Sequence, residues 1–224
     1  MTKVLHREPI VVLVSGRGSN MRALIEDSRA PGAAYSVCAV FSDQPDAAAL
    51  ESARGLDIPA RAIAYVTGTD RTEYDAMLAD AIDECSPSLV VLAGFMRILS
   101  APFVERFAGR ILNIHPSLLP KYPGLHTHRR AIAARDAEHG ATVHFVTEQL
   151  DGGPAVIQAR VPVEPGDTES TLSKRVVVQE HRIYPLAVRW FCEGRLRCEA
   201  GRAWLDGRPL SEPIQISAIE EALP

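Results

Sequence analysis

A histidine and an asparagine lie two residues apart at the end of an apolar run, within residues 111–116. Alternate side chains of an extended strand share a face, so Asn113 and His115 would point the same way while Ile114 packs on the opposite side. An imidazole can accept or donate a proton near pH 7, and an amide N–H can hold a developing oxyanion. The pair therefore suits attack on a carbonyl carbon, although either residue alone could be structural.

Metal chemistry has weaker support. His115, His126 and His128 lack the His-x3-His spacing of a helical metal site, and no carboxylate pattern accompanies them. The four cysteines are scattered and form no Cys-x-x-Cys pair: Cys38, Cys85, Cys192 and Cys198. We expect no metal, and we expect these thiols to be buried in a reducing compartment.

A glycine-rich loop, residues 16–20, lies between an aliphatic run and a helical pattern. Its glycines have no Cβ and its serine and asparagine are short, so free amides at the start of the helix could hold a phosphate. The loop also resembles a dinucleotide fingerprint in which Asp43 would bind a ribose, although Met21 stands in place of the third glycine. A tight turn without a ligand is the third interpretation.

Three other charged residues are ambiguous from the sequence. Asp151 lies in an Asp-Gly-Gly turn, where aspartate is common, and it would act in catalysis only if the fold brings it beside His115. Arg71 opens a predicted helix and Arg97 lies in a loop after a strand, so each could be a solvated surface residue. Their roles depend on the elements that position them.

Buried strands alternate with helices through the first half of the chain. Aliphatic runs predict strands at 10–14, 37–41, 58–63, 89–93 and 111–115, and helical spacing predicts helices after residue 20 and at 47–56, 71–85 and 101–107. This alternation predicts an α/β, Rossmann-like three-layer fold with a mostly parallel central sheet. Ligands should gather where the strands end, which is where the glycine loop, Arg97 and His115 lie.

The second half has a different pattern. It predicts strands at 142–146 and 156–163, a long helix from Asp167 or Thr168 toward Gly194, a hairpin over 195–210 that turns at 206–207, and a weakly patterned tail. Glu180 falls on the apolar face of the long helix, where a charged carboxylate is unusual and calls for a specific explanation.

Composition limits the class of protein. The 224 residues are 46% hydrophobic and 23% charged with a net charge of −4, which argues against nucleic acid as a partner. No stretch has the length and apolar character of a signal peptide or membrane span, so we expect a cytoplasmic protein with no membrane partner. We expect one domain over residues 1–210, with halves at about 9–110 and 111–210, and a C-terminal tail over 211–224.

Six motifs together resemble one family, the phosphoribosylglycinamide formyltransferases, which use 10-formyltetrahydrofolate. They are VVLVSGRGSN at 11–20, VLAGFMRIL at 91–99, NIHPSLLPKYPGLHTH at 113–128, HFVT at 144–147, LDGGP at 150–154 and QEH at 179–181. The resemblance extends from Ile10 to about Leu210. It implies a formyltransferase-type fold, small-molecule substrates, and a monomer or weak homodimer.

The resemblance also implies a role for each matching position. The catalytic residues would be Asn113, His115 and Asp151. The substrate phosphate and ribose would be held by Gly18, Ser19, Asn20 and Glu180, and folate by Arg71, Met96, Arg97, Ile98, Leu99, Thr147 and Leu150. Val177 departs from the pattern, because relatives have a polar side chain there, so one ribonucleotide contact is in question.

The implied reaction is direct transfer of a formyl group from the folate to the amine of glycinamide ribonucleotide. Asn113 and protonated His115 would stabilise the oxyanion, and Asp151 would keep the imidazole charged. Two alternatives share this chemistry, a formyltetrahydrofolate hydrolase and a methionyl-tRNA formyltransferase; each would be expected to have a further domain. A nucleotide-binding Rossmann protein with a structural His115 is the alternative from another class.

Overall fold

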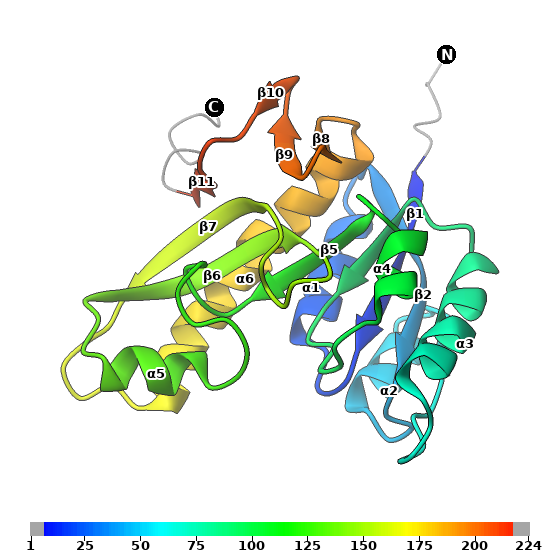
Figure 1. The fold of residues 1–224 in the computed structure, drawn as a ribbon, viewed down its shortest axis with the longest axis horizontal. Helices are drawn as coiled ribbons and strands as arrows, with labels where there is room; N and C mark the ends of the chain where they lie inside the picture. Colours follow the sequence, from blue (N-terminus) through cyan, green and yellow to red (C-terminus); the bar gives the residue numbers. More distant parts are fainter. Residues whose placement is uncertain (1–6, 217–224) are drawn as a thin grey trace.

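An eight-stranded sheet forms the centre of the part of the chain that the computed structural model describes, residues 7–216 (Figure 1). Its strands are β1 (Glu8–Val14), β2 (Tyr35–Ser42), β3 (Ala60–Ala62), β4 (Leu89–Leu92), β5 (Ile111–His115), β6 (Glu138–Phe145), β7 (Ala155–Pro162) and β11 (Ile214–Gln215). They lie in the order β11-β7-β6-β5-β4-β1-β2-β3. β6 is antiparallel to both of its neighbours, and the other pairs are parallel. The predicted fold class is confirmed.

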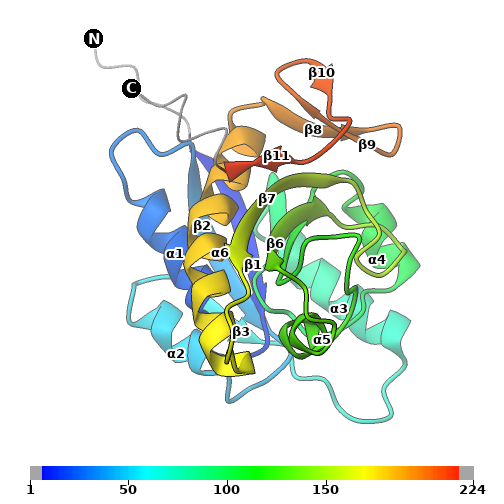
Figure 2. The ribbon, with the colours of Figure 1, turned by 90° about the vertical axis from the view of Figure 1, so that its left-hand side faces the viewer.

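Helices cover both faces of the sheet. α1 (Ser19–Ser28), α2 (Ala48–Arg54) and α6 (Glu169–Cys192) pack in one layer, and α3 (Arg71–Asp83) and α4 (Ala101–Arg106) pack in the other (Figure 2). β1 contributes to both layers, because Val12 packs in the first core cluster and Val11 and Leu13 pack in the second. All three are fully buried, and each contributes about 1.5–3 kcal/mol to stability. Burial on both faces explains why this strand is a continuous aliphatic run.

The segment after β5 contains a helix that the sequence did not predict. α5 (Thr127–Ala133) follows the proline-rich loop and lies beside β6 and α6. β6 begins at Glu138, four residues before the predicted start. Because β5 and β6 pair in antiparallel register, Phe145 at the end of β6 lies beside Leu112 near the start of β5, and the turn that contains Asp151 follows from there.

The last described residues form more strands than predicted. A separate three-stranded sheet contains β8 (Leu196–Glu199), β9 (Arg202–Leu205) and β10 (Arg208–Pro209). Asp206 and Gly207 make the predicted turn, with φ of 50° and 78°, and an unpredicted turn at Ala200 and Gly201 precedes β9. β11, within the predicted tail, pairs with β7 in the main sheet. The remainder of that tail, from 217 to 224, lies outside the described residues.

α6 is the longest helix. Thr168 caps it, with its side chain accepting from the backbone N–H of Thr171, as the predicted start at 167 or 168 requires. The helix continues through Pro185 and ends at Cys192. None of the helices within residues 7–216 combines the length and apolar character of a membrane span.

Candidate active site

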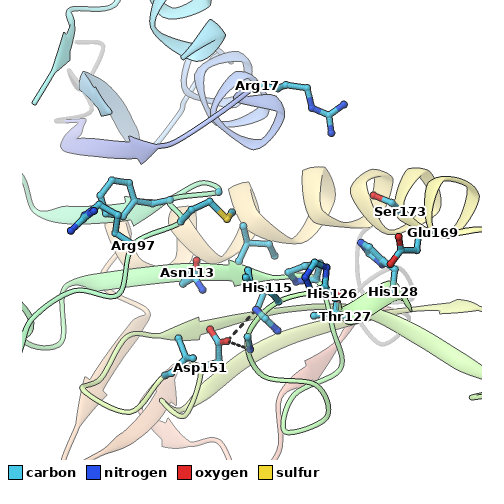
Figure 3. Close-up of a pocket in the computed structure, with 18 of the residues that line it drawn as sticks. Arg17, Arg97, Asn113, His115, His126, Thr127, His128, Asp151, Glu169 and Ser173 are labelled. Atoms are coloured by element: carbon cyan, nitrogen blue, oxygen red, sulfur yellow. Dashed lines mark hydrogen bonds and ion pairs between the residues drawn. The ribbon is translucent and has the colours of Figure 1, made fainter. Parts of the chain in front are cut away.

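A cavity of about 680 Å³ opens where β4 and β5 end (Figure 3). It is lined by residues 17, 94–98, 113–116, 124–128, 150–151 and four residues of α6. Asn113, His115 and Asp151 all line it, from a strand and a turn far apart in sequence. The cavity therefore lies at the sheet edge where a parallel α/β fold places its ligands.

His115 and Asp151 face each other inside this cavity (Figure 3). The distance from His115 Nδ1 to Asp151 Oδ2 is 3.4 Å, and the side chains are 7% and 8% exposed. Asp151 has a φ of 50°, and its Oδ2 also accepts a hydrogen bond of 2.8 Å from the backbone N–H of Gly124. The turn packs closely on β6, since a Cβ on Gly153 would lie 1.9 Å from the backbone oxygen of Phe145. The contact between His115 and Asp151, which the sequence alone could not establish, is therefore present in the structure.

Both nitrogens of the His115 ring have oxygen partners. Nε2 lies 2.9 Å from the backbone oxygen of Tyr122, and a carbonyl oxygen can only accept, so Nε2 carries the hydrogen. Nδ1 faces the carboxylate of Asp151. An imidazolium, with a hydrogen on each nitrogen, would donate to both partners.

His144 belongs to the site, although the sequence assigned it no role. It pairs with Asn113 across β5 and β6, and the distance from Asn113 Nδ2 to His144 Nε2 is 3.1 Å. Its Nδ1 lies 2.9 Å from the backbone oxygen of Phe145, so the hydrogen of a neutral His144 is on Nδ1. Nε2 then accepts from the Asn113 amide, which leaves the second amide N–H of Asn113 available to a ligand.

Burial favours the neutral form of His144, in which Nε2 can accept a hydrogen bond. Its side chain is 2% exposed, and this desolvation lowers the pKa of the imidazole below its ordinary value. His144 Nε2 also lies 3.7 Å from Asp151 Oδ1, so one carboxylate faces both histidines. Asn113, His144, Asp151 and His115 form one connected polar network around the cavity.

The glycine loop begins α1 as predicted. Gly18 is the N-cap residue with a φ of 77°, and a Cβ there would lie 2.7 Å from the Cβ of Ala49, so no other residue fits without a shift. Because the N-cap residue is glycine, it has no side chain to cap the first amides of this helix. Such amides, at the positive end of the helix dipole, suit an anion.

Asn20 joins this loop to α6. Its Nδ2 donates a 2.7 Å hydrogen bond to Glu180 Oε2, and the two residues are 8% and 6% exposed. Burial raises the pKa of the Glu180 carboxyl above its ordinary value, and the bond from Asn20 opposes that shift. Asn20 Oδ1 is buried with no hydrogen-bond partner among the described residues, and a ligand hydroxyl could supply one.

Asp43 does not offer the carboxylate that a dinucleotide would need. It is 3% exposed and accepts hydrogen bonds from Ser15 Oγ at 2.6 Å and from Gln44 Nε2 at 2.8 Å. Ser15 Oγ accepts in turn from the backbone N–H of Met96. Asp43 therefore connects the loops after β1, β2 and β4 instead of facing a ligand.

A second, narrower cavity of about 90 Å³ adjoins the first and contains most of the predicted folate residues. Its lining includes Arg97, Ile98, Leu99, Thr147 and Leu150, together with Asn113, His144 and Asp151. The rim of the larger cavity has apolar side chains open to solvent, with Met96 68%, Ile98 51% and Leu150 50% exposed. Such a rim suits a flat aromatic ligand.

The two predicted folate arginines differ. The Arg97 guanidinium lies 3.5 Å from the ring centroid of Tyr65 and 4.7 Å from that of Tyr74, a cation–π arrangement. Arg71 is the exposed first residue of α3 and lines neither cavity. No group of three potential metal ligands is present within residues 7–216.

Comparison with known proteins gives a consistent result. Residues 8–188 match the formyl transferase family. The phosphoribosylglycinamide formyltransferase of Escherichia coli (strain K12) is 53% identical over 212 residues, covering 95% of this chain and 99% of that protein. The solved structure of the phosphoribosylglycinamide formyltransferase from Coxiella burnetii has a TM-score of 0.88 at 46% identity, covering 93% of this chain and 100% of that one. The chain therefore belongs to the formyl transferase family and, within it, to the phosphoribosylglycinamide formyltransferases.

Proposed function

We propose that this protein transfers the formyl group of 10-formyltetrahydrofolate to the amine of 5'-phosphoribosylglycinamide, a step of de novo purine biosynthesis. The observation that carries the proposal is the buried network of Asn113, His144, Asp151 and His115 at one cavity. This network offers an amide donor and a histidine paired with a carboxylate, which are the groups that a formyl transfer requires.

The reaction proceeds by attack of the neutral amine on the formyl carbon. A C–N bond forms, the carbonyl oxygen becomes an oxyanion, and the second N–H of Asn113 donates to it. The Nε2–H of His115, which donates to the Tyr122 carbonyl in this structure, is shared with the oxyanion once substrates bind. Collapse of the intermediate breaks the bond to the folate nitrogen.

Asp151 completes the proton transfers. Its carboxylate faces His115 Nδ1 and supports the imidazolium. The proton that the amine loses passes through Asp151 to the departing folate nitrogen, so the amine ends as a formamide and the folate as its N–H form. None of these proposed steps uses a metal ion.

The two substrates occupy the two sides of this network. Gly18, Ser19 and Asn20 hold the phosphate at the start of α1, and Glu180 holds the ribose. Folate lies along the apolar rim and the narrow cavity, in contact with Met96, Arg97, Ile98, Leu99, Thr147 and Leu150. Arg71 binds only the outer part of the folate, since it lies outside both cavities.

We assign this activity to a single domain of residues 1–210, with a ribonucleotide-binding half at about 9–110 and a catalytic and folate-binding half at about 111–210. The segment 211–224 is a C-terminal tail that adds β11 to the sheet. The protein acts in the cytoplasm on small molecules, as a monomer or weak homodimer.

A formyl-transfer assay with the wild type and His115→Asn tests the proposal. The wild type should consume formylfolate only when glycinamide ribonucleotide is present, and His115→Asn should lose most of this turnover. Consumption of formylfolate without the ribonucleotide, with release of formate, would instead indicate a hydrolase.

A further inference from the structure

Two cations that line the cavity, Arg17 and Lys174, form no side-chain hydrogen bond or ion pair with other residues of the described part of the chain, 7–216. We infer that Arg17 and Lys174 together clamp the phosphate of the ribonucleotide, an inference that rests on the proposed function. Both residues line the 680 Å³ cavity, and both are exposed. Arg17 comes from the loop before α1, and Lys174 comes from the first half of α6.

The arrangement of α1 and α6 places the first turns of α6 beside the start of α1. Asn20, in the first turn of α1, is bonded to Glu180, and Asp27, in the last turn, is bonded to Arg189. The two helices therefore run side by side in the same direction. α6 begins eleven residues before Glu180, so it extends about 16 Å beyond the start of α1.

This first part of α6 therefore runs alongside the space into which the first backbone N–H groups of α1 point. Val177, one turn before Glu180, has no donor for a phosphate oxygen. Lys174, three residues nearer the start of α6, lines the cavity and has a long stem and an ammonium group that carries three donors. Figure 3 shows Arg17 extending from the loop before α1, above α6. A phosphate on the amides of α1 would lie between the two cations.

The distribution of charge around the cavity supports this inference. Of the described residues that line it, Arg17, Arg97 and Lys174 carry a permanent positive charge. Arg97 is packed over two tyrosine rings. A doubly charged phosphate near the carboxylates of Glu169 and Glu180 needs counter-charge, and no ion pair within residues 7–216 engages Arg17 or Lys174.

The clamp can be tested with ligands that differ only in the phosphate. Glycinamide ribonucleotide and glycinamide riboside would be titrated against the wild type, Arg17→Met and Lys174→Met. Each substitution should raise the Kd of the ribonucleotide about tenfold and leave the Kd of the riboside unchanged. Lys174→Arg should restore binding. Arg22→Met removes the same charge from an exposed position on α1 outside the cavity and should bind as the wild type does.

Two further results would separate the clamp from the proposed function. If both methionine variants bound the ribonucleotide as tightly as Arg22→Met, the clamp would be overturned while the proposed function stood. If the wild type bound no ribonucleotide and transferred no formyl group to it, the proposed function and the clamp would fall together.

Discussion

Replacing His144 tests whether the buried network positions the oxyanion donor. In His144→Leu the acceptor at Nε2 is lost, so the Asn113 amide loses its 3.1 Å hydrogen bond and becomes free to rotate. In His144→Gln the amide oxygen can reach the position of Nε2 and accept in its place. The two variants therefore differ in whether Asn113 stays oriented.

The size of the effect follows from two limits. A neutral hydrogen bond such as that between Asn113 and His144 contributes about 0.5–1.5 kcal/mol, which sets the smaller limit. Complete loss of an oxyanion donor costs about 2.7–4 kcal/mol, which sets the larger limit. We expect kcat to fall about 10- to 100-fold in His144→Leu and by less than about fivefold in His144→Gln.

Steady-state formyl transfer, measured on variants whose folding has been checked by circular dichroism, decides the question. KM for both substrates should change little, because His144 acts through Asn113 and not on the ground-state ligands. The double variant with Asn113→Ala should be no slower than Asn113→Ala alone. Fully additive losses, or a wild-type kcat in His144→Leu, would refute the positioning role.

Three other predictions concern charge, packing and acid stability. Asp151→Asn removes the carboxylate beside His115 and should lower kcat at least about 100-fold in the same assay, and a kcat near that of the wild type would contradict the proton transfer through it. Gly153→Ala would place a Cβ 1.9 Å from a backbone oxygen of β6, so urea unfolding should show a loss of at least about 2 kcal/mol, whereas Gly16→Ala, with nothing within 4 Å, should be nearly neutral. Burial lowers the pKa of His139 from 6.5 to about 4, so between these values the unfolded chain binds a proton that the folded chain does not. The free energy of unfolding should therefore fall by up to about 3 kcal/mol as pH drops from 6.5 to 4, and an unchanged pH dependence in His139→Gln would count against this.

The pairing of Asn113 with His115 at one cavity could be predicted because its signal is local. Asn113 and His115 share a face through the two-residue period of a strand, and the proline-rich segment that follows ends that strand. The buried parallel strands were equally visible, since burial on both faces makes each one a continuous aliphatic run. Family motifs then added roles that the local pattern left open.

The remaining parts depend on contacts between distant residues. His144 meets Asn113 only through the register of β5 with β6, and the end of β6 is buried on both faces, so no alternation marks one side. Asp151 reaches His115 by the same pairing. α5 has seven residues and no side-chain cap, and β11 has two residues, so neither carries a periodic signal.

The central proposal is that Asn113 stabilises the oxyanion of formyl transfer, and one measurement tests it most directly. Single-turnover formyl transfer and substrate binding should be compared in Asn113→Ala and the wild type. We expect the rate of transfer to fall about 10²- to 10³-fold while the Kd values of both substrates remain within about threefold of the wild type. A near-normal rate, or a loss that lies entirely in binding, would contradict the assignment.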